Sequence, residues 1–325
     1  MLKRQERGIM KYVFFDVECS NCFRGEGKLC EFGYVITDEK FCVLRKDVLP
    51  MSPGRGGENR FDTTIYKRDL EFQWAYDIDA YFQFDEYPSF HEKIKSLLED
   101  KQSRVFGYSV GNDIRYIDST VRRYKLNPIQ YQAYDVQKMV NYFLRLKNAL
   151  SLKEAFIQIC DKKELVNIEA HLSRDDAYMT MRIVQNICAK LEITFDELLE
   201  RCPECKLDSE TYLQDYYEHK ERKKKKEEAR RYWNAYCQSQ EQYIPSNIGK
   251  TYAISGRIKE SMEQIHFVIE QMKKRECIAV LKIIDAKYMI VMNQEEKEHI
   301  LESLEDSQEI EFLFYEDLSK EEVPQ

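Results

Sequence analysis

The chain has 325 residues, of which 43% are hydrophobic, and its formal net charge is −8 at pH 7. A chain of this size and composition is expected to fold around one large core with a second, smaller domain. No run approaches the ~20 apolar residues of a membrane span, which excludes a transmembrane protein. The negative charge excludes a protein that coats nucleic acid with its whole surface, although a local basic patch is compatible with it.

The location is expected to be cytoplasmic. The first ten residues, MLKRQERGIM, are basic and lack the apolar stretch of a signal peptide. A chain of this length needs no disulfide framework, so we expect the ten cysteines to be mostly reduced thiols. Cys202 and Cys205 could alternatively form half of a zinc site, but no partner pair or histidine follows at finger spacing.

The first half of the chain alternates strand and helix patterns. Aromatic and β-branched runs at 12–18, 30–37 and 41–49 predict three antiparallel strands, the last two joined by a hairpin turn. A further strand is expected at 104–109. Helices are expected at about 89–99, 113–125, 136–148, 151–160 and 174–191. This alternation is typical of an α/β layer architecture.

The composition changes after Asp196, which predicts three segments. These are a first domain at 1–196, a charged helical connector at 197–247 and a small βαββαβ domain at 248–325. The basic run 219–233 is typical of a solvated helix. It could alternatively steer a nucleic acid backbone and stack a base on Trp233.

Two acids interrupt the first predicted strand. In KYVFFDVECSN, residues 11–21, Asp16 and Glu18 are two positions apart and therefore project to the same face of a strand. Such a pair repels and loses hydration unless a cation or hydrogen-bond donors satisfy it, and a divalent ion with oxygen ligands would do so. The alternative is that the strand has ended and both acids are solvated in the following turn.

Two later stretches add candidate residues. Asp113 follows a predicted strand and enters a helix, where the alternative is an ordinary N-cap. His171 precedes Asp176 by five residues at the start of the last predicted helix of this half. Here the alternatives are a structural histidine and a capping box formed by Ser173 and Asp176.

In combination, these acids and the histidine resemble a known family. An Asp-x-Glu pair on a first strand, an Asp entering a middle helix and His-x4-Asp entering a late helix are similar to the DEDDh family of 3′–5′ exonucleases, which includes the proofreading exonuclease of bacterial DNA polymerase III. The resemblance covers about residues 11–191 and includes the stretches LCEFGYVI, YDVQKMV, LSLKEAFIQIC and HLSRDDAYMT. It implies an RNase H-like α/β fold with a mixed sheet.

The resemblance also implies a set of roles. Asp16, Glu18 and Asp176 would bind one of two divalent ions, Mg²⁺ or Mn²⁺. Asp16 would bridge to the second ion, and Asp113 would contribute directly or through water. His171 would accept the proton of the attacking water, a role suited to a pKa near 6.5.

The implied partner is a single-stranded nucleic acid end. Cys19, Ser20 and Asn21 correspond to the family's substrate-binding segment. We expect hydrolysis of phosphodiester bonds from the 3′ end, with DNA favoured as in editing or repair. The alternatives are an RNA-trimming exoribonuclease and an inactive nuclease-fold binding scaffold.

The last 78 or so residues have a resemblance of their own. The runs IGKTYAISGRI, LKIIDAKYMIVMN and EIEFLFYEDL, with a helix after each of the first two, look like a divergent BRCT domain, with Ser255 and Gly256 at the place of its Ser/Thr-Gly pair. The resemblance implies phosphate binding at that pair. Contact with a protein partner or self-association through this domain is an alternative, and so is a ferredoxin-like βαββαβ fold.

Overall fold

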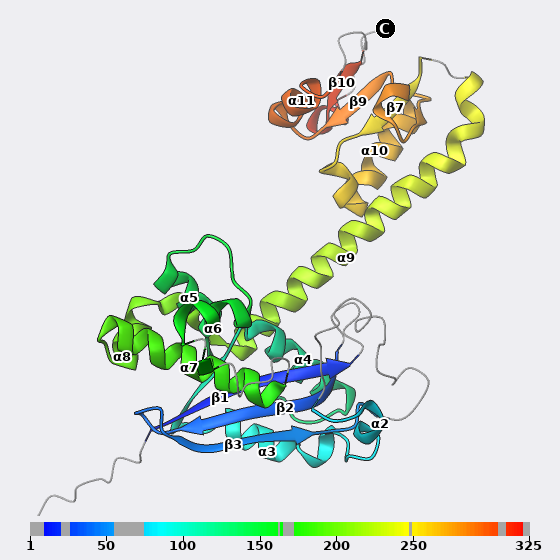
Figure 1. Cartoon of the computed structure of the whole chain (residues 1–325). Helices are drawn as coiled ribbons and strands as arrows, with labels where there is room; N and C mark the ends of the chain where they lie inside the picture. The colour runs from blue at the N-terminus through cyan, green and yellow to red at the C-terminus, as the bar shows by residue number, and fades with distance from the viewer. Residues whose placement is uncertain are drawn as a thin grey trace, which may run out of the picture. The chain divides into compact units, whose positions relative to one another are not determined.

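The chain forms two compact units, Met1–Asp215 and Tyr216–Gln325, in this computed structural model (Figure 1). The structure describes residues 10–20, 27–54, 75–161, 163–164, 172–246, 249–304 and 310–320. Each unit has its own sheet, six-stranded in the first and four-stranded in the second.

The first unit is built on a mixed sheet with the strand order β3-β2-β1-β4-β5-β6. The strands are β1 (Lys11–Ser20), β2 (Lys28–Thr37), β3 (Val43–Pro50), β4 (Ser103–Gly107), β5 (Gln132–Asp135) and β6 (Lys206–Asp208). β1, β2 and β3 pair antiparallel, β1, β4 and β5 are parallel, and β6 returns antiparallel to β5. The expected antiparallel start and the RNase H-like mixed sheet are thereby confirmed.

Helices cover both faces of this sheet. They are α2 (Ile78–Tyr81), α3 (His91–Leu98), α4 (Gly111–Arg123), α5 (Val136–Leu144), α6 (Leu152–Ile159), α7 (Ser173–Leu191) and α8 (Phe195–Arg201). Side chains of α5 to α8 share a core with Phe14 of β1, and those of α3 and α4 share a second core with Phe15. Because side chains alternate along a strand, Asp16 and Glu18 lie on the face of Phe14, which α7 also covers.

All five helices expected in this unit form. α5 ends at Leu144 instead of near residue 148, because Arg145 takes a left-handed C-cap conformation. Among the described residues, every helix is too short or too polar to span a bilayer.

The first unit extends along the chain beyond the expected boundary after Asp196. Leu198, Cys202 and Cys205, expected in the connector, are buried in the core of the first unit. β6 adds a strand to its sheet. Therefore 197–208 belongs to the first unit, and the long helix α9 (Ser209–Gln240) begins there.

The second unit has the expected βαββαβ order. Its elements are β7 (Thr251–Ile254), α10 (Met262–Lys274), β8 (Ile278–Ala279), β9 (Tyr288–Val291), α11 (Gln294–Leu301) and β10 (Glu311–Phe314). The four strands are parallel in the order β10-β9-β7-β8. The ferredoxin-like alternative is wrong, because that fold splits its βαβ units, whereas β7 and β8 are neighbours.

Candidate metal centre

Three carboxylates converge in the first unit. Asp16 and Glu18 from β1 and Asp176 from the first turn of α7 each offer a ligand atom, and these atoms lie within 4.8 Å of one another. No other group of three or more acidic, histidine or cysteine ligands gathers in this way among the described residues. Carboxylate oxygens are the ligands that Mg²⁺ and Mn²⁺ prefer, so the donor set fits a divalent cation.

β1 holds the first two acids inside the sheet. Asp16 pairs with Gly33 and Glu18 with Glu31 of β2, and the strand continues to Ser20. Both acids are partly buried, so the alternative of a solvated turn is wrong. A β-bulge after Glu18 shifts the register, and bulges near active sites commonly re-aim side chains.

Gly33 allows α7 to approach the sheet closely enough to place Asp176. A Cβ on Gly33 would lie 2.1 Å from the carbonyl carbon of Ser173 and 2.2 Å from the nitrogen of Arg174. Only glycine can therefore sit here without moving the start of α7. Since Gly33 pairs with Asp16, the same close approach brings the two carboxylates together.

The start of α7 is organised differently from the expected capping box. Leu172 is the N-cap, and its carbonyl oxygen accepts from the N–H groups of Asp175 at 2.7 Å and Asp176 at 2.9 Å. Ser173 is the first helical residue, and its hydroxyl donates to Glu31 Oε2 at 2.8 Å. The capping box is therefore wrong, and the carboxylate of Asp176 belongs to the acid group.

Glu31 is a site residue that the sequence reasoning missed. It is 1% exposed on β2, and besides the bond from Ser173 it accepts hydrogen bonds from the Tyr81 hydroxyl and the Ala75 N–H. It thus ties β2 to the start of α7. A glutamate within the otherwise apolar run LCEFGYVI was the available signal.

Asp113 lies beside the group of three without belonging to it. It occupies the first turn of α4, whose N-cap is Val110, so the N-cap alternative is wrong. The residue is 5% exposed, and its Oδ2 finds no hydrogen-bond partner among the described residues. A buried carboxylate oxygen without a partner is costly, and a cation would satisfy it.

Burial and mutual repulsion make it unfavourable for all of these acids to be ionised together. Burial raises the pKa of Asp16 well above its ordinary range, and the charges of Asp113, Asp176 and Glu18 raise it further. Burial likewise raises the pKa of Asp113, with a contribution from Asp135. Burial also raises the pKa of Glu31, although the hydrogen bond from Ser173 opposes this shift. A bound cation would reverse the cost of ionising these groups.

The other residues expected near this site are only partly described. His171 and Asn21 lie outside the described residues. Cys19 and Ser20 are buried, at 8% and 1% exposure, and in the described part of the chain the Ser20 hydroxyl has no hydrogen-bond partner. Their side chains therefore offer little surface to a substrate, and substrate binding by the backbone of this segment stays a prediction.

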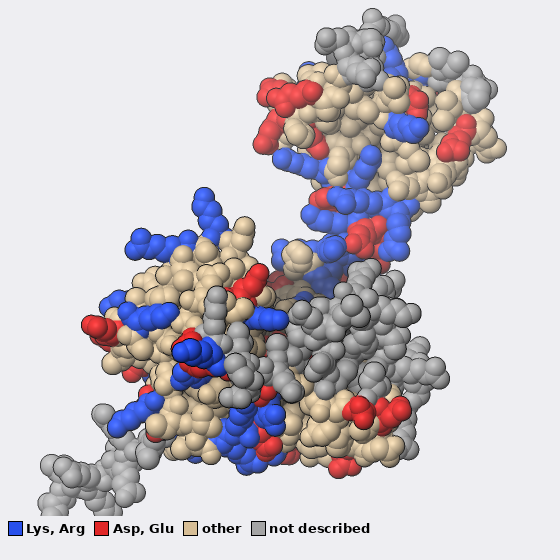
Figure 2. Space-filling view, viewed as in Figure 1, with Lys and Arg blue, Asp and Glu red and all other residues tan. Residues whose placement is uncertain are grey.

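The Ser255–Gly256 pair of the second unit lies in an acidic setting. Ser255 is 1% exposed, and the N–H of Arg257 donates to Glu296 Oε1 at 3.3 Å. Acidic side chains gather over α11 beside this pair (Figure 2). A carboxylate thus binds the backbone N–H that follows Gly256, and phosphate binding at the Ser255–Gly256 pair stays a prediction.

Two further sequence features receive structural assignments. Residues 218–228 of α9 are exposed on all sides, and Lys and Arg gather there (Figure 2). Trp233 is 0% exposed in the core of the second unit, so the base-stacking alternative is wrong. Cys202 and Cys205 are buried free thiols, and no further ligand joins them in the described part of the chain.

Comparisons with known proteins return structures and no sequence family. Neither a protein-family model nor a curated protein matches the sequence. Escherichia coli exonuclease I in complex with a dA16 oligonucleotide is similar at 17% identity and a TM-score of 0.47, over 58% of this chain and 42% of that one. This chain therefore spans less than half of the length of exonuclease I.

Two further structures are also similar. The zinc-bound form of the E. coli exonuclease I complex with single-stranded DNA matches at 16% identity and a TM-score of 0.47, over 59% of this chain and 43% of that one. A structure of a 3′-exonuclease that recognises the histone mRNA stem-loop matches at 11% identity and a TM-score of 0.44, over 56% and 83% of the two chains.

Proposed function

We propose that this chain is a divalent-metal-dependent 3′–5′ exonuclease that hydrolyses phosphodiester bonds at single-stranded nucleic acid ends, with DNA as the favoured substrate. The observation that carries the proposal is the convergence of Asp16, Glu18 and Asp176 within 4.8 Å beside buried Asp113. Four acids at this density are costly to the fold and are explained by a cation-dependent reaction.

The residues would divide the work as follows. Asp16, Glu18 and Asp176 would hold one Mg²⁺ or Mn²⁺ ion, and Asp16 together with Asp113 would hold a second. Bound ions of this kind neutralise charge on the phosphate and lower the pKa of water. Glu31 keeps the start of α7 against β2, so that Asp176 stays in register with Asp16.

The proton transfer is assigned to His171 as a proposal. A neutral imidazole is available at physiological pH and could accept a proton from the attacking water. His171→Ala should lower turnover by roughly 10²- to 10⁴-fold while metal binding is kept. A variant that no longer unfolds cooperatively would instead identify a structural histidine.

The second unit is proposed to be an interaction domain. Its four parallel strands are compatible with the BRCT-like assignment, and contact with a protein partner or a second copy remains the proposed role. A cytoplasmic location is retained in the proposal, since the described cysteines are free thiols.

The activity can be tested with matched end-labelled single-stranded DNA and RNA oligomers in Mg²⁺ or Mn²⁺, following the product ladder. We expect shortening from the 3′ end, faster for DNA, and its loss in Asp113→Asn. Asp118→Asn is the matched control, because Asp118 lies on the same helix but pairs with Arg122 at 2.8 Å. Faster RNA shortening would identify an exoribonuclease, and no cleavage of either would indicate an inactive scaffold.

A further inference from the structure

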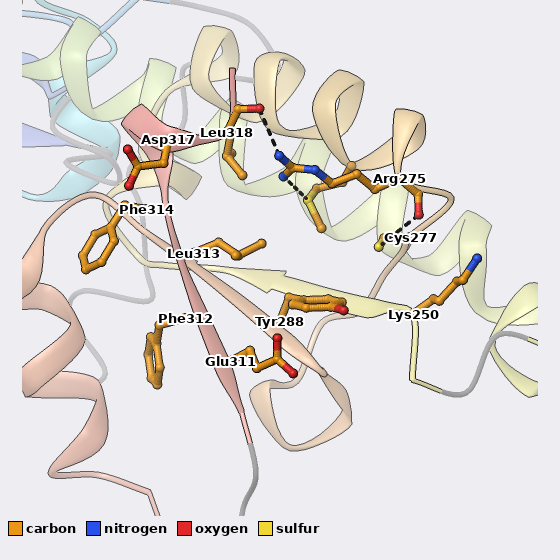
Figure 3. A pocket seen from close by; sticks show the side chains of 11 residues that line it. Lys250, Arg275, Cys277, Tyr288, Glu311, Phe312, Leu313, Phe314, Asp317 and Leu318 are labelled. Carbon is orange, nitrogen blue, oxygen red and sulfur yellow. Dashed lines mark hydrogen bonds between the residues drawn. The ribbon is translucent and has the colours of Figure 1, made fainter. Parts of the chain in front are cut away.

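The second unit contains a pocket beside its edge strand. The pocket has a volume of about 330 Å³ and lies between the end of α10, the start of β9 and strand β10 (Figure 3). Its apolar lining includes Met272, Tyr288, Leu313 and Leu318. The volume is at the lower end of the ~300–1,000 Å³ usual for ligand pockets, which suits one or two side chains.

The pocket lies next to β10, the strand at one edge of the sheet. In the described part of the chain β10 pairs only with β9. The N–H of Glu311 donates to the carbonyl oxygen of Lys287 at 2.9 Å, so the parallel ladder turns the peptide groups of Phe312 and Phe314 away from β9. These outward donors and acceptors could pair with another extended backbone.

The side chains of β10 match such an arrangement. Leu313 points to the side of β10 opposite to Phe312 and Phe314, toward Leu318 and Arg275 (Figure 3). A segment added alongside β10 would alternate in the same way. Every second side chain of that segment would therefore face the pocket.

The charged residues that line the pocket indicate which charge a bound segment should carry. Three of the four charged lining residues have ion-pair partners: Lys250 pairs with Glu276 at 2.9 Å, Glu311 with Lys287 at 3.0 Å and Asp317 with Lys320 at 2.6 Å. The fourth, Arg275, donates to the Leu318 carbonyl oxygen at 3.3 Å and contacts Met272 Sδ at 3.8 Å. No acidic partner for Arg275 lies among the described residues, so its guanidinium can donate hydrogen bonds to a carboxylate of a ligand.

We propose that β10 and this pocket bind an extended segment of a partner protein by strand addition. The segment places an apolar side chain in the pocket and, two residues away on the same face, a carboxylate on Arg275. Backbone pairing to Phe312 and Phe314 supplies affinity, and the pocket with Arg275 supplies specificity. This role goes beyond nuclease activity and does not depend on it.

The probe is a panel of short, capped, fluorescent peptides in a Thr and Ser background. Each carries Leu, Ile, Phe or Met at one central position and Glu two positions later, with a Gln version as the neutral partner. We expect fluorescence anisotropy with the full chain to show binding that favours Glu over Gln. No binding by any peptide would overturn the proposal.

Arg275→Gln tests the charge. It should weaken binding of the Glu peptides about tenfold or more and leave the Gln peptides nearly unchanged, since hydrogen bonds to charged groups are stronger than those between neutral groups. Arg275→Lys should restore part of the loss. Lys274→Gln is the matched control, because Lys274 is exposed, pairs with Glu270 at 3.6 Å and lies outside the pocket lining. Equal weakening by both Gln variants would overturn the assignment of Arg275.

Phe312→Pro tests strand addition. It removes an outward N–H without removing a bond of the β9–β10 ladder, so the unit should remain folded while peptide binding is lost. Phe312→Val keeps the N–H and controls for loss of the ring. If no peptide binds and ultracentrifugation shows a dimer that only the Pro variant abolishes, the edge pairs with a second copy and the proposal is wrong.

Discussion

Each unit gathers acidic side chains, but the two groups differ in burial and in what surrounds them. In the first unit Asp113 and Asp176 are 5% and 8% exposed. In the second, the side chains of Glu295 and Glu302 near Gly256 are 79% and 81% exposed. The number of acids is similar, so their number alone does not make a metal site.

Convergence and desolvation distinguish the two groups. The ligand atoms of the first group lie within 4.8 Å of one another, and burial raises the pKa of Asp16. In the second group Glu295 lies 3.4 Å from Arg257, and Glu296 accepts hydrogen bonds from the backbone N–H groups of Arg257 and Met292. The second group is therefore paired with protein donors, whereas the first would be stabilised by the cation that we propose.

Truncation tests whether the first group depends only on its own unit. A fragment ending at residue 196 lacks Leu198 and Cys202, which are 0% exposed, as well as strand β6. Because these residues complete the core, we expect the fragment to lose cooperative unfolding, while 1–215 keeps it and is stabilised by Mn²⁺. Circular dichroism melts of both fragments measure this. A cooperative melt of 1–196 would show that the core is complete without α8 and β6.

Asp16→Asn tests whether the acid group supports activity and lowers the stability of the metal-free protein. Activity should fall more than about 100-fold, since even outer ligands of a metal contribute 10- to 100-fold. The metal-free variant should melt no lower than the wild-type chain, because Asn removes a charge from a repulsive, buried cluster. Stabilisation by Mn²⁺ should be lost.

The stability gain from Asp16→Asn should depend on pH. The folded-state pKa of Asp16 is raised, so its contribution to stability is full below the unfolded-state pKa of ~4 and is lost as the pH rises through the folded-state pKa. The advantage of Asn should thus be largest at high pH and disappear in acid. A gain that grows toward low pH would contradict the assignment. Thermal melts of both proteins without metal, from acid to high pH, measure this difference in stability.

Gly33→Ala tests the close approach that assembles the group. A Cβ there would lie 2.1 Å from backbone atoms of Ser173, so the start of α7 must move. We expect a loss of ~1–3 kcal/mol in the free energy of unfolding, as for overpacked cores, together with weaker Mn²⁺ binding. Gly256→Ala is the matched control in the second unit, where no atom lies within 4 Å of the added Cβ. Equal effects of the two substitutions would remove the special role of Gly33.

The sequence predicted the parts of this site that depend on local spacing. The period of a strand places Asp16 and Glu18 on one face, and the helical pattern after Ser173 locates Asp176. It could not predict the contact of Ser173 with Glu31, because that bond joins a helix to a strand far away in the chain. The expected boundary after residue 196 is also incorrect because it depends on contacts between residues that are far apart in the chain. Cys202 and Cys205 lie in a charged stretch of the sequence, and only the folded structure shows that they are buried in the core.

The smallest effect is expected from the exposed acids of the second unit. Glu295→Gln with Glu302→Gln removes two charges that water already screens, so stability should change by no more than about 0.5 kcal/mol. Mn²⁺ should stabilise this double variant as much as the wild-type chain, because neither carboxylate belongs to the converging group. Melts with and without Mn²⁺, beside Asp16→Asn, make the comparison direct. A loss of metal stabilisation in the double variant would place a second cation site over α11, and exposure would then no longer separate the two groups of acids.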